Sequence, residues 1–553
     1  MINSIPSYLT EKFGQCLFVS NLPVGSLLRF DKSGTSQYAI EFNSNYSNDQ
    51  YIKLLQDVYS LSCDSLLSIS EYYRQRSQFY LIFNPCSVKS YFDIFNQNFS
   101  INIHDVLNYG IKSTELFSKI DDAKKVGKFH IEPNLIFFKD GKIGKPVLAP
   151  LPMPQTPAIS DLVFCSKESI FFYTKEMILR NENANELLCQ IGMMIKNILC
   201  DNSLLRGRNV YDSIEKTVHS LQKKLVINPA IESTFVRDVM SNKLDDLLKL
   251  IQDITAPGKN HKVENLKDFI NSLKILEDDF KPVNVANTLY INQYYEQALK
   301  IIDDLLAAEK DNLNALMLKG KILIKSEKIS ENLESIAIFN EIIKREPYKL
   351  SAYESKARAF ENCEMVPAAV MTYEEIIRNG IATIDTYHKL IEDLKIVGRI
   401  DEAIACAEEM IKINYLDFEF MIIKTELLML KGTIDEAETF AMQTVIIINH
   451  LHESKKMSHT ILFPELSKVY NILGSIQFAK RQFDKSKELF QKALYYDKMN
   501  WRVYNNLGQL YLETFKELDA CDCFLNSISI KPDQERIMDK LATLMVKFGA
   551  VKI

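Results

Sequence analysis

The second half of the chain repeats itself at an interval of 34 residues. The segments Asn471-Ile472-Leu473-Gly474 and Asn505-Asn506-Leu507-Gly508 stand at this interval. Twelve residues after each glycine comes a small residue, and an aromatic residue follows four positions later, at Phe490 and Phe524. A period of roughly 20 to 50 residues indicates an array of supersecondary units, each of which must stack on its neighbours to bury its apolar face.

The small-residue position recurs toward the N-terminus, again in steps of 34, at Ala437, Ala403, Ala369 and Ser335. Ala298 precedes Ser335 by 37 residues, which predicts a three-residue insertion near 325–332. Between Ala437 and Ser486 the step is 49, so we expect about 15 extra residues around 450–464. These steps predict about seven units over 282–532 and a capping helix over 533–553 that covers the last apolar face.

This spacing of aromatic, Leu-Gly, small and aromatic residues resembles the tetratricopeptide repeat (TPR) family. The resemblance implies an all-α solenoid of antiparallel helix pairs, whose inner helices line a groove for proteins or peptides. Its groove positions fall on a mixed set of side chains: Lys321, Arg358, Glu392, Glu426, Asn505 and Gln509. None of the groove pairs is the Lys/Asn pair with which chaperone-binding members clamp a terminal carboxylate, so the sequence does not support chaperone-tail binding.

Several short stretches of the first half form an ordered series of motifs. Residues 133–149 contain an asparagine, Asn134, then an apolar strand, an Asp-Gly turn and a closing Leu-Ala. Gly25 opens a stretch that resembles a reduced glycine-rich loop, and Tyr38-Ala39-Ile40-Glu41 resembles the Val-Ala-Ile-Lys strand. In this order the stretches resemble the protein kinase family, and the resemblance implies a two-lobed α+β kinase-like fold over residues 15–255.

The resemblance also implies that the chemistry of a kinase is missing. Glu41 stands where the phosphate-binding lysine is expected, and residues 42–70 contain no glutamate to hold such a lysine. Phe129 takes the position of the catalytic base, and Lys145 that of the metal-binding aspartate, whereas Asn134 keeps the family's residue. We therefore expect a pseudokinase without catalytic residues. Arg29 or Lys32 could in principle substitute for the missing lysine, but nothing nearby replaces both the base and the metal ligand.

The expected organisation has four parts. The kinase-like domain covers 15–255, a linker and lead-in helix 256–281, the repeats 282–532 and the capping helix 533–553. The boundary is placed at Ala256-Pro257-Gly258-Lys259-Asn260, because this stretch interrupts a helical pattern.

Composition excludes several classes of function. A net charge of -6 over 553 residues provides no electrostatic basis for binding nucleic acid or anionic membrane. The ten cysteines are scattered, with no zinc or redox spacing, so we expect no metal site. No signal peptide pattern or membrane span is evident, and we expect a soluble cytoplasmic protein. No cofactor is predicted, although the residues leave open ATP binding without magnesium at Gly25 and Lys145.

Three hypotheses on function follow. The preferred one is a non-catalytic signalling scaffold, or adaptor, that binds proteins through the repeats and the degenerate kinase-like domain. The second is an atypical protein Ser/Thr kinase with relocated catalytic residues. The third is a structural TPR subunit of a larger assembly.

Overall fold

The computed structural model describes two compact units, Met1–Leu318 and Lys319–Ile553. Within them it describes residues 5–33, 35–83, 89–90, 102–124, 129–131, 135–139, 144–153, 186–200, 234–255, 263, 265–414, 418–454 and 457–547. The division falls inside helix α14 (Leu313–Leu323). This is a division by contacts, and the four-part organisation expected from the sequence stays a prediction.

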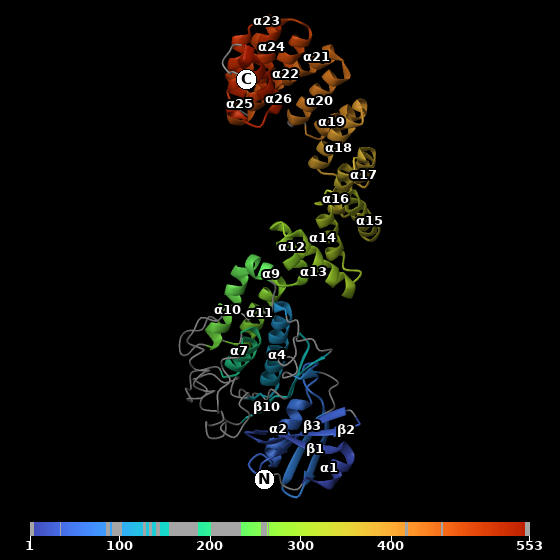
Figure 1. The fold of residues 1–553 in the computed structure, drawn as a ribbon, viewed down its shortest axis with the longest axis vertical. Coiled ribbons are helices and arrows are strands. Elements are labelled where there is room, and N and C mark those ends of the chain that lie inside the picture. Colours follow the sequence, from blue (N-terminus) through green and yellow to red (C-terminus); the bar gives the residue numbers. More distant parts are fainter. Residues whose placement is uncertain are drawn as a thin grey trace. The chain divides into compact units, whose positions relative to one another are not determined.

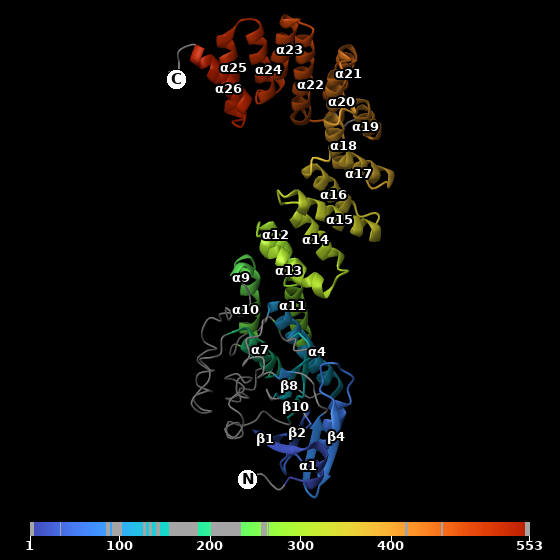
Figure 2. The ribbon, with the colours of Figure 1, turned by 45° about the vertical axis from the view of Figure 1, so that its right-hand side comes forward.

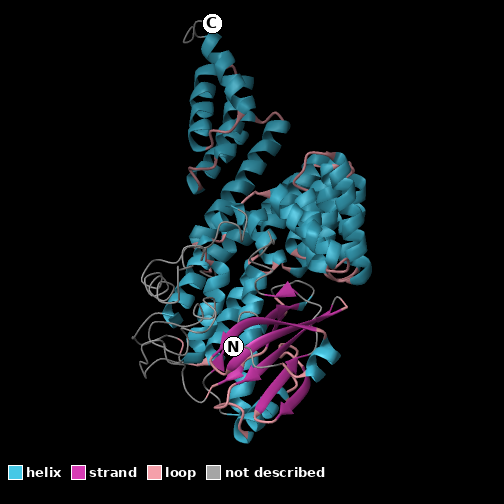
Figure 3. Cartoon of the chain, turned by 60° about the horizontal axis from the view of Figure 1, so that its bottom comes forward, coloured by secondary structure: helices cyan, strands magenta, loops and turns pink. Residues whose placement is uncertain are grey.

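The first unit begins with an antiparallel sheet of five strands in the order β1-β2-β3-β5-β4 (Figure 3). The strands are β1 (Gln15–Leu22), β2 (Gly25–Lys32), β3 (Thr35–Phe42), β4 (Ile69–Gln75) and β5 (Gln78–Phe83). Helix α1 (Ser7–Phe13) precedes the sheet, and helix α2 (Asp49–Tyr59) lies between β3 and β4 in the chain. The Asn48 side chain accepts a hydrogen bond from the Tyr51 backbone N–H and so caps α2.

Alternate residues of the strands bury two different cores, because successive side chains of a strand point to opposite faces. One face packs against Leu9 and Phe13 of α1 through Leu28, Phe30, Ala39, Tyr80 and Ile82. The other face packs against Tyr51 and Leu55 of α2, and against side chains of residues 135–137 and 147–153, through Leu27, Ile40, Phe42, Phe79 and Leu81. The sheet is therefore buried on both sides over much of its area.

A helical part follows the sheet in the same unit (Figure 1). Helix α4 (Ile103–Lys124) packs against α7 (Glu186–Leu199) and α11 (Leu266–Asp279), and α7 packs against α10 (Ser241–Thr255). Short strands accompany them: β6 (Lys89–Ser90), β7 (Phe129–His130), β8 (Ile136–Phe138), β9 (Pro146–Leu148) and β10 (Leu151–Pro152). Gly192 of α7 makes room for α10, since a Cβ atom there would lie 2.6 Å from Ile254 Cδ1.

The expected lead-in helix is α11, and it packs against the helical part of the first unit. Lys274 pairs with Glu115 of α4 at 2.8 Å, and His104 Nδ1 lies 3.3 Å from Glu277 Oε1. Helix α9 (Thr234–Val239) then contacts α12 (Pro282–Ile291), which forms a hairpin with α13 (Tyr295–Ala308).

Six more helical hairpins follow among the described residues, and Figure 2 shows their helices in succession. They pair α14 with α15 (Ile329–Arg345), α16 (Leu350–Asn362) with α17 (Val366–Arg378), α18 (Ile384–Ile396) with α19 (Ile400–Ile413), α20 (Phe418–Lys431) with α21 (Ile434–Glu453), α22 (His459–Ala479) with α23 (Phe483–Tyr496) and α24 (Trp501–Glu513) with α25 (Glu517–Ile530). Helix α26 (Glu535–Lys547) comes last.

The repeated glycine and phenylalanine of the sequence meet in the hairpins. A Cβ atom on Gly508 of α24 would lie 2.5 Å from the Phe524 ring of α25, and one on Gly474 of α22 would lie 2.6 Å from the Phe490 ring of α23. Real Cβ atoms do not approach so closely, so only glycine lets these rings pack onto the first helix. In these two hairpins, the 34-residue period is thus the interval at which the packing contact between glycine and phenylalanine recurs.

The expected 15-residue excess around 450–464 is largely helical. It lengthens α21 to 20 residues and α22 to 21 residues, and Pro464 stands inside α22. The added turns pack against their neighbours through Leu451 and Leu462, which are both buried. The sequence spacing gave only the length of this stretch, because its histidines and lysines obscure the apolar positions.

Helix α26 packs against the last hairpin. Leu541 and Leu544 of α26 are buried against Ala520, Cys521 and Phe524 of α25. Among the described residues, no helix combines the length and the hydropathy that crossing a bilayer requires.

Candidate functional site

The six residues predicted for partner binding all lie on the first helix of a hairpin. Arg358 of α16, Glu392 of α18 and Glu426 of α20 are exposed. Lys321 of α14 and the α24 residues Asn505 and Gln509 are half-buried. A single groove running through all six stays a prediction.

Charges from three successive hairpins act on one another around Glu354 of α16. Burial raises the pKa of the Glu354 carboxyl above its usual value, and the negative charge of Asp385 raises it further. The cations Arg358 and Lys321 act in the opposite direction. Side chains of α14, α16 and α18 therefore form one mixed-charge surface, on which a partner would meet both signs.

A second carboxylate pair joins α16 and α18. Asp393 is only 5% exposed, and its Oδ2 atom has no hydrogen-bond partner within the described part of the chain. Burial, followed by the charge of Glu361, raises the pKa of Asp393 to about 6. The Tyr373 hydroxyl donates a 2.9 Å hydrogen bond to Glu361 Oε1, which leaves Asp393 as the poorly solvated member of the pair.

The two predicted residues of α24 already have partners from the C-terminal segment. Asn505 Nδ2 donates to Gln534 Oε1 at 2.8 Å, and Lys540 Nζ of α26 donates to Gln509 Oε1 at 2.8 Å. An incoming peptide would have to compete with these hydrogen bonds. Sequence spacing could not indicate this, because it assigns positions within one repeat and not what the next helix places beside them.

A pocket between α19, α20 and α21 was not predicted from the sequence. Its volume is about 540 Å³, and Lys424 lines it with its ammonium 4.3 Å from the Phe440 ring centre and 2.8 Å from Glu408 Oε1. Lys431 pairs with Asp401 at 2.7 Å on the same wall. Both cations are therefore paired internally, and no signal in the repeat pattern marks them.

The structure places the residues expected to replace kinase machinery as follows. Phe129 lies on β7, buried against Phe117 with ring centres 5.2 Å apart. Lys145 is an exposed turn residue whose carbonyl accepts a hydrogen bond from the Lys139 backbone N–H at 3.0 Å. Gly25 begins β2, and a Cβ atom there would lie 1.9 Å from the Glu41 carbonyl oxygen. Asn134 lies outside the described residues.

The remaining one of these positions, Glu41, lies on β3. Glu41 lies opposite Tyr80 in the β3–β5 register, and the Tyr80 hydroxyl donates to Glu41 Oε1 at 2.9 Å. Its side chain is therefore on the face that α1 partly covers. The neighbouring residues Ile40 and Phe42 point to the other face.

That other face of the sheet is filled by apolar side chains. The ring centres of Tyr38 and Phe137 are 5.3 Å apart, which joins β3 to β8. Leu27, Ile40 and Leu135 are at most 1% exposed in the same cluster. In this part of the unit the described residues form a continuous core between the sheet and the β8–β9 hairpin.

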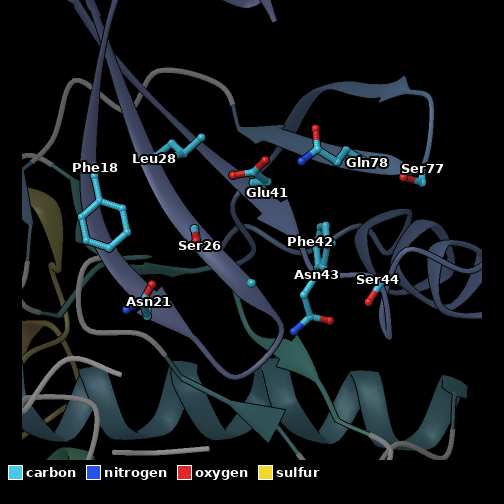
Figure 4. A pocket seen from close by; sticks show the side chains of 11 residues that line it. Phe18, Asn21, Ser26, Leu28, Glu41, Phe42, Asn43, Ser44, Ser77 and Gln78 are labelled. Carbon is cyan, nitrogen blue, oxygen red and sulfur yellow. The ribbon is translucent and has the colours of Figure 1, made fainter. Parts of the chain in front are cut away.

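A pocket lies on the face of the sheet that bears Glu41 (Figure 4). Its volume is about 610 Å³, and Phe18, Ser26, Glu41 and Gln78 line it from β1, β2, β3 and β5. Among the described residues, no group of three or more His, Cys, Asp and Glu side chains is placed to hold a metal ion.

Comparison with known proteins identifies the repeats. The tetratricopeptide repeat model matches residues 467–498 and 502–534, which cover most of the hairpins α22–α23 and α24–α25. The chain therefore contains TPR repeats, and its C-terminal part is an all-helical TPR-like solenoid. No curated protein matches the chain.

Three solved structures illustrate the likeness. YrrB, described as a TPR protein with an unusual peptide-binding site, is 14% identical, with 43% of this chain and 96% of that chain covered and a TM-score of 0.25. The C-terminal part of a TPR repeat-containing protein from Cytophaga hutchinsonii is 13% identical, with 47% and 99% covered and a TM-score of 0.34. The Cut9–Hcn1 hetero-tetramer of APC/C is 14% identical, with 70% and 69% covered and a TM-score of 0.29. All three TM-scores are below 0.5.

Proposed function

We propose that this protein is a non-catalytic scaffold or adaptor that binds other proteins. The TPR match carries the proposal, because helical repeats of this kind present extended surfaces to peptides and partner helices. The exposed charges on the first helices, among them Arg358, Glu392 and Glu426, supply the polar contacts that such a surface uses to select a partner.

We further propose that the N-terminal domain is a degenerate kinase-like domain. Its support is the chain order of three antiparallel strands, a helix and two more strands, in a sheet ordered β1-β2-β3-β5-β4 and followed by a helical part. The sequence resemblance is to a family with this arrangement. The apolar filling between the sheet and the β8–β9 hairpin supports a domain without nucleotide chemistry, since phosphoryl transfer requires positioned phosphates and metal ions.

Charge reversal on the repeats tests the scaffold role. The full chain, its Arg358→Glu variant and its Glu426→Lys variant would be compared by quantitative affinity capture with chemical crosslinking. We expect both variants to lose partners that the natural chain retains. A partner whose charges complement the natural surface is repelled where a charge of that surface is reversed.

Matched reversals on a second helix serve as controls. Lys485 and Glu488 are exposed residues of α23, so Lys485→Glu and Glu488→Lys change the same charges away from the first helices. Equal partner recovery from all four variants and the natural chain would contradict binding through the first helices. Phosphate transfer from ATP to any protein substrate by the natural chain would contradict the non-catalytic role.

A further inference from the structure

One face of the N-terminal sheet is only partly covered. Helix α1 buries Leu9 and Phe13 against Leu28 and Phe30, while the end of the same face that carries Glu41 stays open. The opening is the pocket of about 610 Å³ drawn in Figure 4. A concavity of this volume is within the range of small-ligand and side-chain binding pockets.

The lining of the pocket contains one formal charge. Glu41 supplies a carboxylate, and Lys, Arg and His are all absent from the lining residues. Among the ion pairs of the described residues, none involves Glu41. A half-buried carboxylate without a counter-ion attracts a cation more strongly than an exposed one, because less water screens it.

The carboxylate is held in place before any ligand arrives. The buried Tyr80 hydroxyl donates to Glu41 Oε1 at 2.9 Å, and the β2–β3 register places Ser26 beside Glu41. Burial, and then the hydrogen bond to Glu41, raise the pKa of the Tyr80 phenol, which keeps it a donor over the physiological range. Preorganised groups bind with a smaller loss of conformational entropy.

The rest of the lining suits a peptide better than a free amine. Side-chain amides and hydroxyls surround the carboxylate and can pair with peptide N–H and C=O groups; they belong to Asn21, Ser26, Asn43, Ser44, Ser77 and Gln78. At the rim, the Phe18 ring is 46% exposed on β1. An aromatic ring and a carboxylate that line the same pocket favour an arginine, because its long apolar stem can contact the ring while its guanidinium pairs with the carboxylate.

We propose that this pocket binds an arginine side chain presented by a segment of a partner protein. The inference rests on the proposed role of the chain as a scaffold, and it assigns a docking point to the N-terminal domain that is separate from the repeats. Glu41 is the charged anchor, Phe18 covers the side-chain stem, and the amides and hydroxyls receive the flanking peptide groups.

A ligand-observed NMR titration of the full chain tests this. The probes are acetyl-Ala-Arg-Ala-amide, its citrulline analogue, which has nearly the same shape without the charge, and arginine amide as a free cation. We expect the arginine peptide to bind about fivefold more tightly than either of the other probes, as a half-buried charged hydrogen bond allows. Glu41→Gln should remove this preference, whereas Glu11→Gln, an exposed carboxylate of α1, should keep it.

A second variant tests the pocket separately, in case Glu41→Gln impairs folding. Ser26→Lys places an ammonium next to Glu41, so it should fill the pocket and abolish binding of the arginine peptide. Equal binding of the arginine and citrulline peptides, or unchanged binding by Ser26→Lys, would overturn the proposal. Free arginine amide binding as tightly as the peptide would overturn the assignment to a protein segment. Partner capture by the repeat variants is measured separately, so failure here leaves the scaffold role standing.

Discussion

The ring of Tyr38 packs against the ring of Phe137, with centres 5.3 Å apart and planes inclined by 60°. This contact joins the N-terminal sheet to the β8–β9 hairpin, some hundred residues further along the chain. Aromatic pairs at this separation are favourable beyond the area that they bury. In the proposed kinase-like domain, this is the region where a nucleotide would have to enter.

We expect ATP to leave the melting temperature of the full chain unchanged, with or without magnesium. Binding would have to displace Leu27, Ile40 and Leu135 from a buried cluster, which costs more than a nucleotide contact returns. Differential scanning fluorimetry measures the shift. Glu41→Lys should not create one, because residue 41 lies on the opposite face of β3. A magnesium-dependent rise in the melting temperature would show that the buried cluster opens to admit ATP, and it would contradict the prediction that ATP does not bind.

The glycine of the repeat should tolerate no side chain. Gly508→Ala places a Cβ atom 2.5 Å from the Phe524 ring, so we expect a loss of about 1–3 kcal/mol in the free energy of unfolding. Urea denaturation measures it. The double variant Gly508→Ala with Phe524→Leu should recover part of the loss relative to the sum of the single variants, because the smaller side chain vacates the clash. Strict additivity would exclude this contact as the cause.

Asp393 should weaken the repeats at neutral pH. Its folded-state pKa of about 6 lies above the unfolded value near 3.9, so the ionised form destabilises the folded state most at pH values above 6. That destabilisation is relieved as the pH falls from about 6 toward 4. We therefore expect Asp393→Asn to stabilise the protein by about 1 kcal/mol at pH 8, with the gain shrinking toward pH 4.

Urea melts at both pH values measure the effect of Asp393→Asn. Glu392→Gln changes an exposed carboxylate one residue away on α18 and should leave stability nearly unaltered. A gain from Asp393→Asn that is independent of pH would mean that the carboxyl group does not titrate as its burial beside Glu361 requires.

Disrupting α26 should loosen the last hairpin before the others. Leu541→Asp puts a charge against Phe524 and Cys521, which we expect to cost about 2–4 kcal/mol. Because each repeat contacts mainly its neighbours, hydrogen exchange should speed up in α24–α25 first and much less in α16–α17. Met538→Asp, at a 41% exposed position of the same helix, is the control. Uniform acceleration across the second unit would contradict local capping.

Much of the second unit could be predicted from the amino-acid order. The 34-residue interval between Gly474 and Gly508 predicts the hairpins, because a ring at Phe490 or Phe524 requires a glycine opposite it. The capping helix was predicted because the last repeat has no following repeat to cover its apolar face. Only packing decided that Asn505 and Gln509 are engaged by Gln534 and Lys540, because no pattern within a repeat encodes a neighbouring segment.

In the first unit, tertiary packing decided more than the sequence pattern predicted. The order of its motifs implied a two-lobed α+β fold, but it did not indicate which face of β3 carries the Glu41 side chain. A shift of one position along a strand moves a side chain to the other face, and neither Ile40 nor Glu41 carries a local signal that settles the choice. Tertiary packing settled it: α2 and Phe137 cover the face of Ile40, and the Tyr80 hydroxyl meets Glu41 on the other. Periodic contacts can be read along the chain, whereas the face of a strand is decided by what packs on it.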